Sequence, residues 1–240
     1  MKPRILALGD GALTLEFGNR INSALNARVM AARDALATMN LDGISDVVPA
    51  YSSLTVHFDP LRLDREVLAE RLRDAAQASA KESALATRWT LPVVFGDEFG
   101  PDLAEVARAT GRSESAVIEA LCASELHVFL IGFLPGFPYL GELPEWLRLP
   151  RRTTPRTAVP ANSLAIAGAQ AAVYPWQSPG GWHLLGRTPV RLFDLNDVAR
   201  PALLAPGDTV SFAPLSRDEF LRLEADVAKG KKGRRDWQAT

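Results

Sequence analysis

Prolines are concentrated in one stretch of this chain, and they limit what that stretch can fold into. Nine of the 17 prolines lie between Pro135 and Pro189. Proline has no backbone N–H and a fixed φ, so it interrupts helices and is confined to sheet edges. Short strand-like runs, such as 163–168 and 182–186, lie among these prolines. Many short strands separated by Pro/Gly turns predict a barrel or a sandwich for residues 89–215.

The first 80 residues have a different pattern. Apolar residues recur at helical spacing in 20–38, and a second helix is predicted from 63, with Asp64 as its N-cap. Strand-like runs precede and separate these two segments, at 4–8, 12–17, 44–50 and 53–59. This order predicts an α+β fold, in which a small N-terminal domain over residues 1–80 has a sheet covered on one face by two helices.

The periodic pattern is lost in residues 81–88, which are predicted to be a linker. The run VRLF, residues 190–193, is predicted to be one of the short strands of the second domain. The last part, 216–240, is predicted to be a closing helix followed by a frayed basic tail.

Composition excludes several classes of partner. The formal net charge is -1, which argues against nucleic acid, because phosphate binding needs a basic field. No apolar run approaches the roughly 18 to 20 residues of a membrane span. The single cysteine, Cys122, excludes an internal disulfide, and the N-terminus does not have the pattern of a signal peptide. We therefore expect a cytoplasmic protein with neither a nucleic acid nor a membrane as partner.

The segment IGFLPGFPYL, residues 131–140, places three aromatic side chains where no regular element can form. Pro135 and Pro138 prevent a helix or a central strand. The aromatic residues Phe133, Phe137 and Tyr139 are therefore either a plug in the core or the wall of a site.

Two further Pro-rich segments contain candidate anion-binding groups. Residues 149–163 hold Arg151, Arg152 and Arg156 among three prolines, so the loop either binds an anion or is a solvated surface loop. In the run 177–189, the two glycines before Trp182 allow positive φ and exposed N–H groups; the alternative is a tight turn with Trp182 in the core. Within this run, the backbone N–H groups of Gly180 and Gly181 could bind an oxyanion, and Arg187 could bind an anion. For each of them the alternative is a purely structural role.

No complete catalytic set is visible in the sequence. Gln170 stands at a predicted turn and could bind an amide, although such a glutamine more often satisfies the loop backbone. His183 is the histidine best placed to reach a site, but no histidine has the spacing of a metal ligand, so no metal is predicted. The chain also lacks a P-loop and a GxSxG elbow. These features favour a binding module, or a subunit that completes a site with another chain.

Long motifs in the same segments resemble a known family. The matching pieces are GFLPGFPYLG, LPRRTTPRTAVPA, the glycine-glutamine turn at Gly168 and Gln170, and SPGGWHLLGRTP. They resemble the bacterial 5-oxoprolinase B-subunit family, also called the KipI-like or allophanate hydrolase subunit 1 family, a carboxyltransferase-type domain with subdomains C and D. The resemblance implies that the second domain is a cyclophilin-like β-barrel.

The resemblance also implies a function. It implies that this chain, with partner subunits A and C, opens 5-oxo-L-proline to L-glutamate in an ATP-dependent reaction, with Mg expected beside ATP and the nucleotide site shared with or on a partner. The protein is expected to be inactive alone. Candidate catalytic residues are Arg156, Gln170 and His183. Residues expected to bind substrate are Pro135, Gly136, Phe137, Tyr139, Arg151, Arg152, Arg156, Gln170, Gly180, Gly181, Trp182 and Arg187.

Some positions depart from the family pattern. Asn162 stands where glycine is usual, His183 where glutamine is common, and Ala169, Ala171 and Ala172 replace glycine or threonine. Another lactam or a urea-like amide is therefore an alternative substrate. A second alternative is an inhibitor of a sensor histidine kinase, and a third is a degenerate member that serves only as a structural partner.

Overall fold

The computed structural model of this chain describes residues 2–78 and 86–239. The chain divides into two compact units, Met1–Ala86 and Thr87–Thr240, here called unit 1 and unit 2. Most of the predicted linker, 81–88, lies outside the described residues, and strand β5 begins at Arg88, inside that predicted range.

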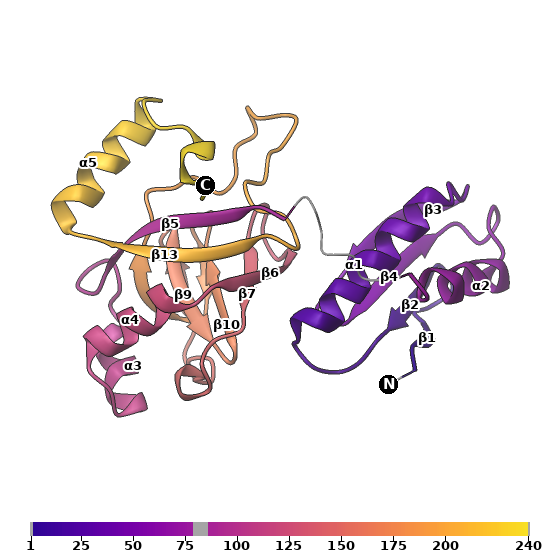
Figure 1. Cartoon of the computed structure of the whole chain (residues 1–240), viewed down its shortest axis with the longest axis horizontal. Helices are drawn as coiled ribbons and strands as arrows, with labels where there is room; N and C mark the ends of the chain where they lie inside the picture. The colour runs from indigo at the N-terminus through magenta and orange to yellow at the C-terminus, as the bar shows by residue number, and fades with distance from the viewer. Residues whose placement is uncertain (1, 79–85, 240) are drawn as a thin grey trace. The chain divides into compact units, whose positions relative to one another are not determined.

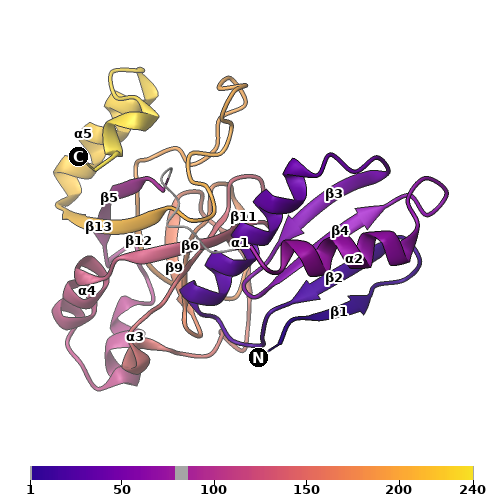
Figure 2. The same cartoon turned by 45° about the vertical axis from the view of Figure 1, so that its right-hand side comes forward.

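Unit 1 is a four-stranded antiparallel sheet with two helices (Figure 1, Figure 2). The strand order is β1-β2-β4-β3, and the helices lie side by side on one face. Alternate residues of β4 are buried, as expected when only one face of a sheet is covered. The bounds are β1 Arg4–Ala7, β2 Ala12–Glu16, α1 Ser23–Thr38, β3 Ile44–Pro49, β4 Ser53–Phe58 and α2 Arg65–Ala75.

The predicted start of the second helix is confirmed. The Asp64 carboxylate accepts hydrogen bonds from the backbone N–H groups of Glu66, at 2.8 Å, and Val67, at 3.2 Å. These are two of the donors that the first turn of a helix leaves unpaired. The predicted α+β architecture of this part of the chain, a sheet with two helices, is also confirmed.

Unit 2 is built around a closed seven-stranded barrel with the strand order β10-β7-β6-β13-β5-β12-β9. A separate two-stranded ribbon pairs β11 with β8. Helix α5 lies on the opposite side of β5 and β13 from α3 and α4 (Figure 1). The strands are β5 Arg88–Phe95, β6 Leu126–Ile131, β7 Pro138–Gly141, β8 Arg156–Val159, β9 Ser163–Ala167, β10 Gln170–Val173, β11 Ser178–Gly180, β12 His183–Arg187 and β13 Thr209–Leu215. The helices are α3 Leu103–Thr110, α4 Glu114–Ala123 and α5 Arg217–Ala228, with short 3-10 turns η1 Glu145–Leu147 and η2 Arg234–Trp237.

One part of the barrel wall is buried on both faces. In β9, Leu164 and Ile166 belong to the main core, whereas Ala165 and Ala167 belong to a second apolar cluster. Strands β7, β10 and β12 divide their residues between the same two clusters. Successive residues of a strand point to opposite faces, so the second cluster lies on the outer face of the wall. Here the outer face supports a packed layer of its own, and we call it the outer cluster.

The predicted strand at 190–193 is wrong. Val190 and Leu192 are buried in the main core, which explains the strand-like alternation of the sequence. The backbone is irregular, however, because Val190 N–H bonds to the Thr188 hydroxyl and Phe193 forms only an isolated bridge with Ala202.

The end of the chain is not a frayed tail. Residues 229–239, here called the C-terminal strap, return to the barrel and include η2. Gln238 forms a bridge with Trp89, and Ala239 N–H donates to the Arg88 carbonyl at 2.8 Å. Trp237 packs against the main core. The composition of this segment is polar and basic, but one tryptophan and a few backbone bonds are enough to attach it.

Within the described residues, the structure contains no helix of the length and apolar character that a membrane span requires.

One buried carboxylate organises the start of β5. Asp208 is 2% exposed. It accepts hydrogen bonds of 2.9 Å from Thr87 N–H, Trp89 Nε1–H and Ala205 N–H. The Arg200 guanidinium lies 3.4 Å from the same carboxylate. Asp208 therefore ties the beginning of the barrel to the loop before β13.

Replacement of Asp208 tests this arrangement. Asp208→Asn removes the charge and one acceptor, so we expect the free energy of unfolding of unit 2 to fall by about 2–3 kcal/mol. All five tryptophans belong to unit 2, so tryptophan fluorescence in urea reports its unfolding. Glu119→Gln, on the exposed side of α4, is the matched control and should change stability by less than about 0.5 kcal/mol. Equal stability of both variants would contradict the role given to Asp208.

Candidate functional site

A cavity of about 460 Å³ opens over the outer cluster of unit 2. Its volume is within the range of small-molecule sites, about 300–1,000 Å³. The lining is mainly aromatic and Pro/Gly, with one charged side chain. The lining residues are Phe133, Leu134, Phe137, Tyr139, Arg151, Pro155, Tyr174, Ser178, Pro179, Gly180, Gly181 and Trp182.

The loop between β6 and β7 forms one wall of this cavity. Phe137 N–H donates to the Leu134 carbonyl at 3.0 Å, and Gly132 N–H donates to the Phe137 carbonyl at 3.1 Å. Gly136 has a φ of +78°, and a Cβ there would lie 2.7 Å from Cβ of Phe193. Only glycine combines this φ with so close a neighbour. Gly136, together with Pro135, therefore shapes the loop without lining the cavity.

The prediction that Pro138 prevents a central strand is wrong, because β7 begins at Pro138, contains Tyr139 and pairs with a strand on each side; proline is tolerated as the first residue of a strand. The aromatic side chains of this segment are both plug and wall. Phe137 is 2% exposed and lies at the centre of the outer cluster. Its ring centroid is 5.0 Å from Tyr139, 5.1 Å from Tyr174 and 6.1 Å from Trp182. Phe133, by contrast, is 63% exposed. The edge-to-face geometry of these pairs stabilises the cluster beyond the area that it buries.

Strand β11 and the two residues after it form another part of the lining. The prediction that Gly180 and Gly181 are needed for a positive φ is wrong, because neither residue has one. Gly180 is needed for space, because a Cβ there would collide with the Tyr174 hydroxyl. Trp182 is buried in the outer cluster, as the tight-turn alternative expected, and it also lines the cavity.

Two of the three loop arginines are held by a carboxylate. Asp102 is 3% exposed, and its Oδ1 accepts from Arg152 Nη1 at 3.0 Å and from Arg156 Nη2 at 2.6 Å. Its Oδ2 accepts from Leu184 N–H at 2.7 Å. Arg152 also pairs with the exposed Glu105 at 3.1 Å. Arg152 and Arg156 are absent from the cavity lining.

Sequence reasoning missed Asp102, although one signal was present. The residue follows Pro101 at the N-cap position of α3, where an aspartate usually caps the helix. Its side chain makes no capping bond. It is directed instead to β12 and to the arginines, 50 and 54 residues further along the chain.

Arg151 differs from its neighbours. Its guanidinium lies 5.8 Å from the centroid of the Trp182 ring, a cation–π distance. Within the described residues, no carboxylate lies within ion-pair distance of Arg151. Among the described residues it is the one charged group of the cavity lining, so an anionic ligand would meet a cation there without a competing carboxylate.

The two tyrosines of the cavity are hydrogen-bond donors at neutral pH. Burial raises the pKa of Tyr174 to about 12, and the positive charge of Arg151 opposes this only in part. Burial also raises the pKa of Tyr139. Both hydroxyls therefore keep their protons, and they can donate to a ligand oxygen but cannot act as bases.

The remaining candidates lie outside the cavity lining. His183 is 7% exposed, and its Nε2 is 2.9 Å from the Pro150 carbonyl. Its buried Nδ1 has no partner within the part of the chain that the structure describes. Arg187 donates through Nε to the Ala161 carbonyl at 3.0 Å. Gln170 begins β10 beside the turn at Gly168.

The departures from the family pattern are also absent from the cavity lining. Asn162 has a φ of +63°, and asparagine is among the non-glycine residues that best tolerate this region. Ala171 packs in the main core and Ala172 in the outer cluster. Ala169 is in the turn between β9 and β10, and its carbonyl accepts from Leu143 N–H at 3.1 Å.

The buried carboxylate of Asp102 allows a prediction. Asp102→Asn leaves two half-buried guanidinium groups, 25% and 26% exposed, without their carboxylate, so we expect a loss of about 3 kcal/mol in unit 2. Glu105→Gln removes the exposed partner of the same arginine and should cost less than about 1 kcal/mol. Urea unfolding followed by tryptophan fluorescence measures both. Similar losses in the two variants would show that burial of Asp102 is not decisive.

A second prediction concerns alkaline pH. The pKa of Tyr174 is raised from 10.0 to about 12, so over that interval the folded state keeps a proton that the unfolded chain releases. The stabilisation is present below pH 10 and is lost as pH approaches 12. We expect the stability of unit 2 to fall less steeply over this range in Tyr174→Phe than in the parent. Absorbance at 295 nm should also lose its most alkaline phenolate transition in Tyr174→Phe; an unchanged titration would refute the assignment.

Comparison with known proteins assigns this chain to a family. Residues 3–204 match the family described as carboxyltransferase domain, subdomain C and D. A Bacillus subtilis protein named as the 5-oxoprolinase B-subunit is 36% identical over 231 residues, covering 90% of this chain and 95% of that protein.

Two solved structures are similar. The crystal structure of TTHA0988 matches with a TM-score of 0.76 and 38% sequence identity. The match covers 85% of this chain but only 40% of the TTHA0988 chain. The urea amidolyase of K. lactis has a TM-score of 0.82 at 19% identity, covering 95% of this chain and 16% of that chain, which supports the fold alone. By its match over residues 3–204 and its similarity to the B. subtilis protein, this chain belongs to the carboxyltransferase-domain, subdomain C and D family that includes the 5-oxoprolinase B-subunit.

Proposed function

We propose that this chain is a subunit of an ATP-dependent 5-oxoprolinase and that the cavity over the outer cluster binds 5-oxo-L-proline. The name of the B. subtilis relative supports the reaction. The observation that carries the substrate site is Arg151, a cation without a carboxylate partner among the described residues, at an aromatic cavity.

The chemistry of 5-oxoproline matches this lining. The substrate has one carboxylate and one five-membered lactam ring. Arg151 would pair with the carboxylate through its planar fork. The rings of Tyr139 and Trp182 would contact the lactam ring, and a tyrosine hydroxyl would donate to the lactam oxygen.

The lactam is a stable amide, so its opening needs activation. We propose that the γ-phosphoryl group of ATP is transferred to the lactam oxygen, which leaves ADP. Water then adds to the activated carbon, and the C–N bond breaks as the nitrogen takes a proton, which gives γ-glutamyl phosphate. A second water hydrolyses this acyl phosphate to L-glutamate and inorganic phosphate. Neutral tyrosine hydroxyls and the cation of Arg151 suit the negative charge of these steps.

The nucleotide fits a partner better than this cavity. Mg²⁺ is bound by carboxylates and phosphates, and the described lining contains no aspartate or glutamate. One arginine is also little compensation for a triphosphate. We therefore propose that ATP, with Mg, binds on a partner or at a site shared with one, that subunits A and C are those partners, and that this chain is inactive alone.

The proposal changes the roles expected from the sequence. Arg156, Gln170 and His183 were candidates for catalysis, but they are absent from the lining. We propose that Arg156 and Arg152 position the loop that carries Arg151, through their shared contact with Asp102. Arg151 becomes the residue that contacts the substrate.

The alternatives are less well supported by this geometry. A urea-like amide has no carboxylate and would leave Arg151 unpaired. A histidine-kinase inhibitor would not need an unpaired cation over an aromatic cavity. The urea-like amide and the kinase inhibitor each have their own outcome in the experiment below.

Reconstitution with subunits A and C from the same genome tests the substrate site. We expect lactam-stimulated ATP hydrolysis that requires this chain. In Arg151→Ala, the KM for 5-oxoproline should rise about 30- to 1,000-fold, as loss of a charge-assisted pair of about 2–4 kcal/mol implies. Arg222→Ala, an exposed arginine of α5, controls for lost positive charge and should behave as the parent.

A second substrate makes this test specific. The lactam 2-pyrrolidinone lacks the carboxylate, so the parent complex should discriminate strongly against it, and Arg151→Ala should lose most of that discrimination. Equal losses for both lactams would contradict the pairing of Arg151 with a carboxylate. A stable complex that hydrolyses ATP only with a urea-like amide would favour that substrate, and inhibition of kinase autophosphorylation without any lactam would favour the regulator.

A further inference from the structure

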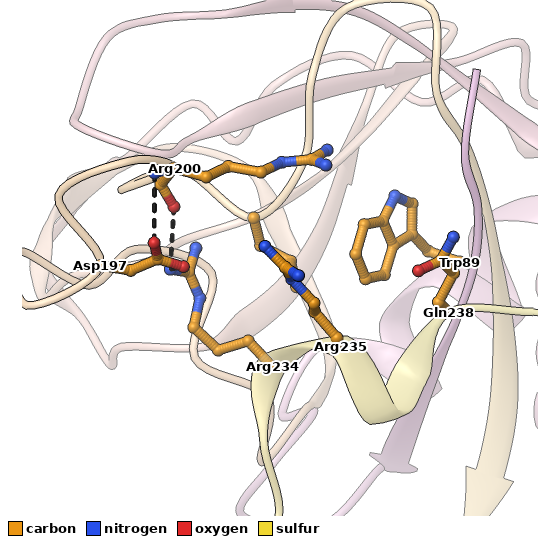
Figure 3. Close-up of a pocket in the computed structure, with 7 residues that line it drawn as sticks. Trp89, Asp197, Arg200, Arg234, Arg235 and Gln238 are labelled. Atoms are coloured by element: carbon orange, nitrogen blue, oxygen red, sulfur yellow. Dashed lines mark hydrogen bonds and ion pairs between the residues drawn. The ribbon is translucent and has the colours of Figure 1, made fainter. Parts of the chain in front are cut away.

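A second cavity, of about 270 Å³, lies where the C-terminal strap meets the barrel of unit 2 (Figure 3). It shares no lining residue with the cavity over the outer cluster. Three segments form it: the start of β5, the loop 194–203 and the strap. Its lining residues are Trp89, Asp197, Arg200, Leu203, Arg234, Arg235 and Gln238.

Arg234 is the fixed member of this cavity. Its Nη1 donates to the Asp197 carboxylate at 3.1 Å and to the Arg200 carbonyl at 3.0 Å, and its Nη2 donates to the Pro201 carbonyl at 2.8 Å. The buried Nε–H of Arg234 has no acceptor in the described part of the chain. A buried donor without an acceptor is uncommon and is often explained by an unseen partner.

Arg200 is only weakly neutralised. Its guanidinium lies 5.7 Å from the centroid of the Trp89 ring and 3.4 Å from the Asp208 carboxylate. That carboxylate oxygen already accepts bonds of 2.9 Å from Trp89 Nε1–H and Ala205 N–H. The ion pair of Arg200 is therefore the longest of the contacts that this oxygen makes.

Arg235 has no carboxylate within ion-pair distance among the residues that the structure describes. Figure 3 shows its side chain extending from η2 toward the space between Arg200 and Trp89. The lining thus has three cations and one carboxylate, and Arg234 already uses that carboxylate. Convergence of Arg200 and Arg235 on one space is unfavourable unless an anion lies between them.

We propose that this cavity is a binding site for a phosphate group, either free or carried by a small molecule. Guanidinium groups bind phosphate oxygens with paired, charge-assisted hydrogen bonds. Arg200 and Arg235 would contact the anion from two segments, and the Nε–H of Arg234 is a further donor. A bound phosphate would join the C-terminal strap to the loop 194–203. The site is independent of the 5-oxoprolinase proposal and needs neither partner subunits nor turnover.

The indole N–H of Trp89 is a local reporter for this site, because its hydrogen bond to Asp208 lies beside Arg200. We would titrate this 240-residue chain with inorganic phosphate at constant ionic strength, with chloride as the balancing anion, and follow the indole resonances by NMR. The Trp89 resonance is identified from Trp89→Phe. We expect a saturable shift below about 10 mM phosphate. Isothermal calorimetry gives the affinity.

Matched arginine variants distinguish phosphate binding at this cavity from nonspecific attraction by the overall positive charge. Arg235→Ala should weaken phosphate binding at least tenfold, whereas Arg222→Ala, with the same change of charge, should leave the affinity unchanged. If Arg235→Ala disturbs folding by circular dichroism, Arg235→Gln keeps most of the side-chain length and removes the charge. Adenosine monophosphate in place of phosphate distinguishes a carried phosphate, which would bind more tightly than the free ion. No saturable Trp89 shift in the parent, or equal weakening by both alanine variants, would overturn the proposal.

Discussion

The buried carboxylate of Asp102 is the interaction on which the candidate site depends. It holds the backbone of β12 through Leu184, the loop of Arg152, and the first residue of β8, Arg156. The N–H of Asp102 also donates to the Leu184 carbonyl at 3.0 Å, so the start of α3 is fixed to the same strand. A carboxylate removed from water needs such compensation, and two guanidinium groups with one backbone N–H supply it. The wall of the cavity is thus attached to the barrel by charge.

The position of the cavity follows from a barrel wall with two buried faces. On the inner face of β9, Leu164 and Ile166 fill the main core, whereas its outer face has Ala165 and Ala167. The small outward side chains leave space above the wall for the aromatic rings of the outer cluster. The ribbon of β8 and β11 then closes part of that space. The cavity is the remainder, bounded by rigid rings rather than by flexible chains, which suits a small flat ligand.

The sequence predicted those features that depend on neighbours along the chain. Asp64 caps its helix as expected because capping involves only the next three residues. The prolines correctly indicated many short strands, and the barrel is one of the two architectures that they predicted, the other being a sandwich. Asp102 and the C-terminal strap were not found, because their partners are distant in sequence: Leu184 lies 82 residues after Asp102, and Gln238 pairs with Trp89. Of the three loop arginines, only the structure separates Arg151 from the pair that Asp102 neutralises.

The chemistry of the cavity is consistent with a division of labour between subunits. A lactam-opening site must recognise its substrate, stabilise negative charge and activate water. The described lining has a cation and neutral hydroxyls for the first two tasks, but no carboxylate, and no histidine, for the third. The raised pKa of Tyr174 keeps its hydroxyl from serving as a base. If the cavity is the lactam site, we propose that the base comes from a partner chain at its open side. The exposed Phe133 and Trp176, whose indole N–H bonds to the Pro135 carbonyl at 3.1 Å, place apolar surface at that loop for such a contact.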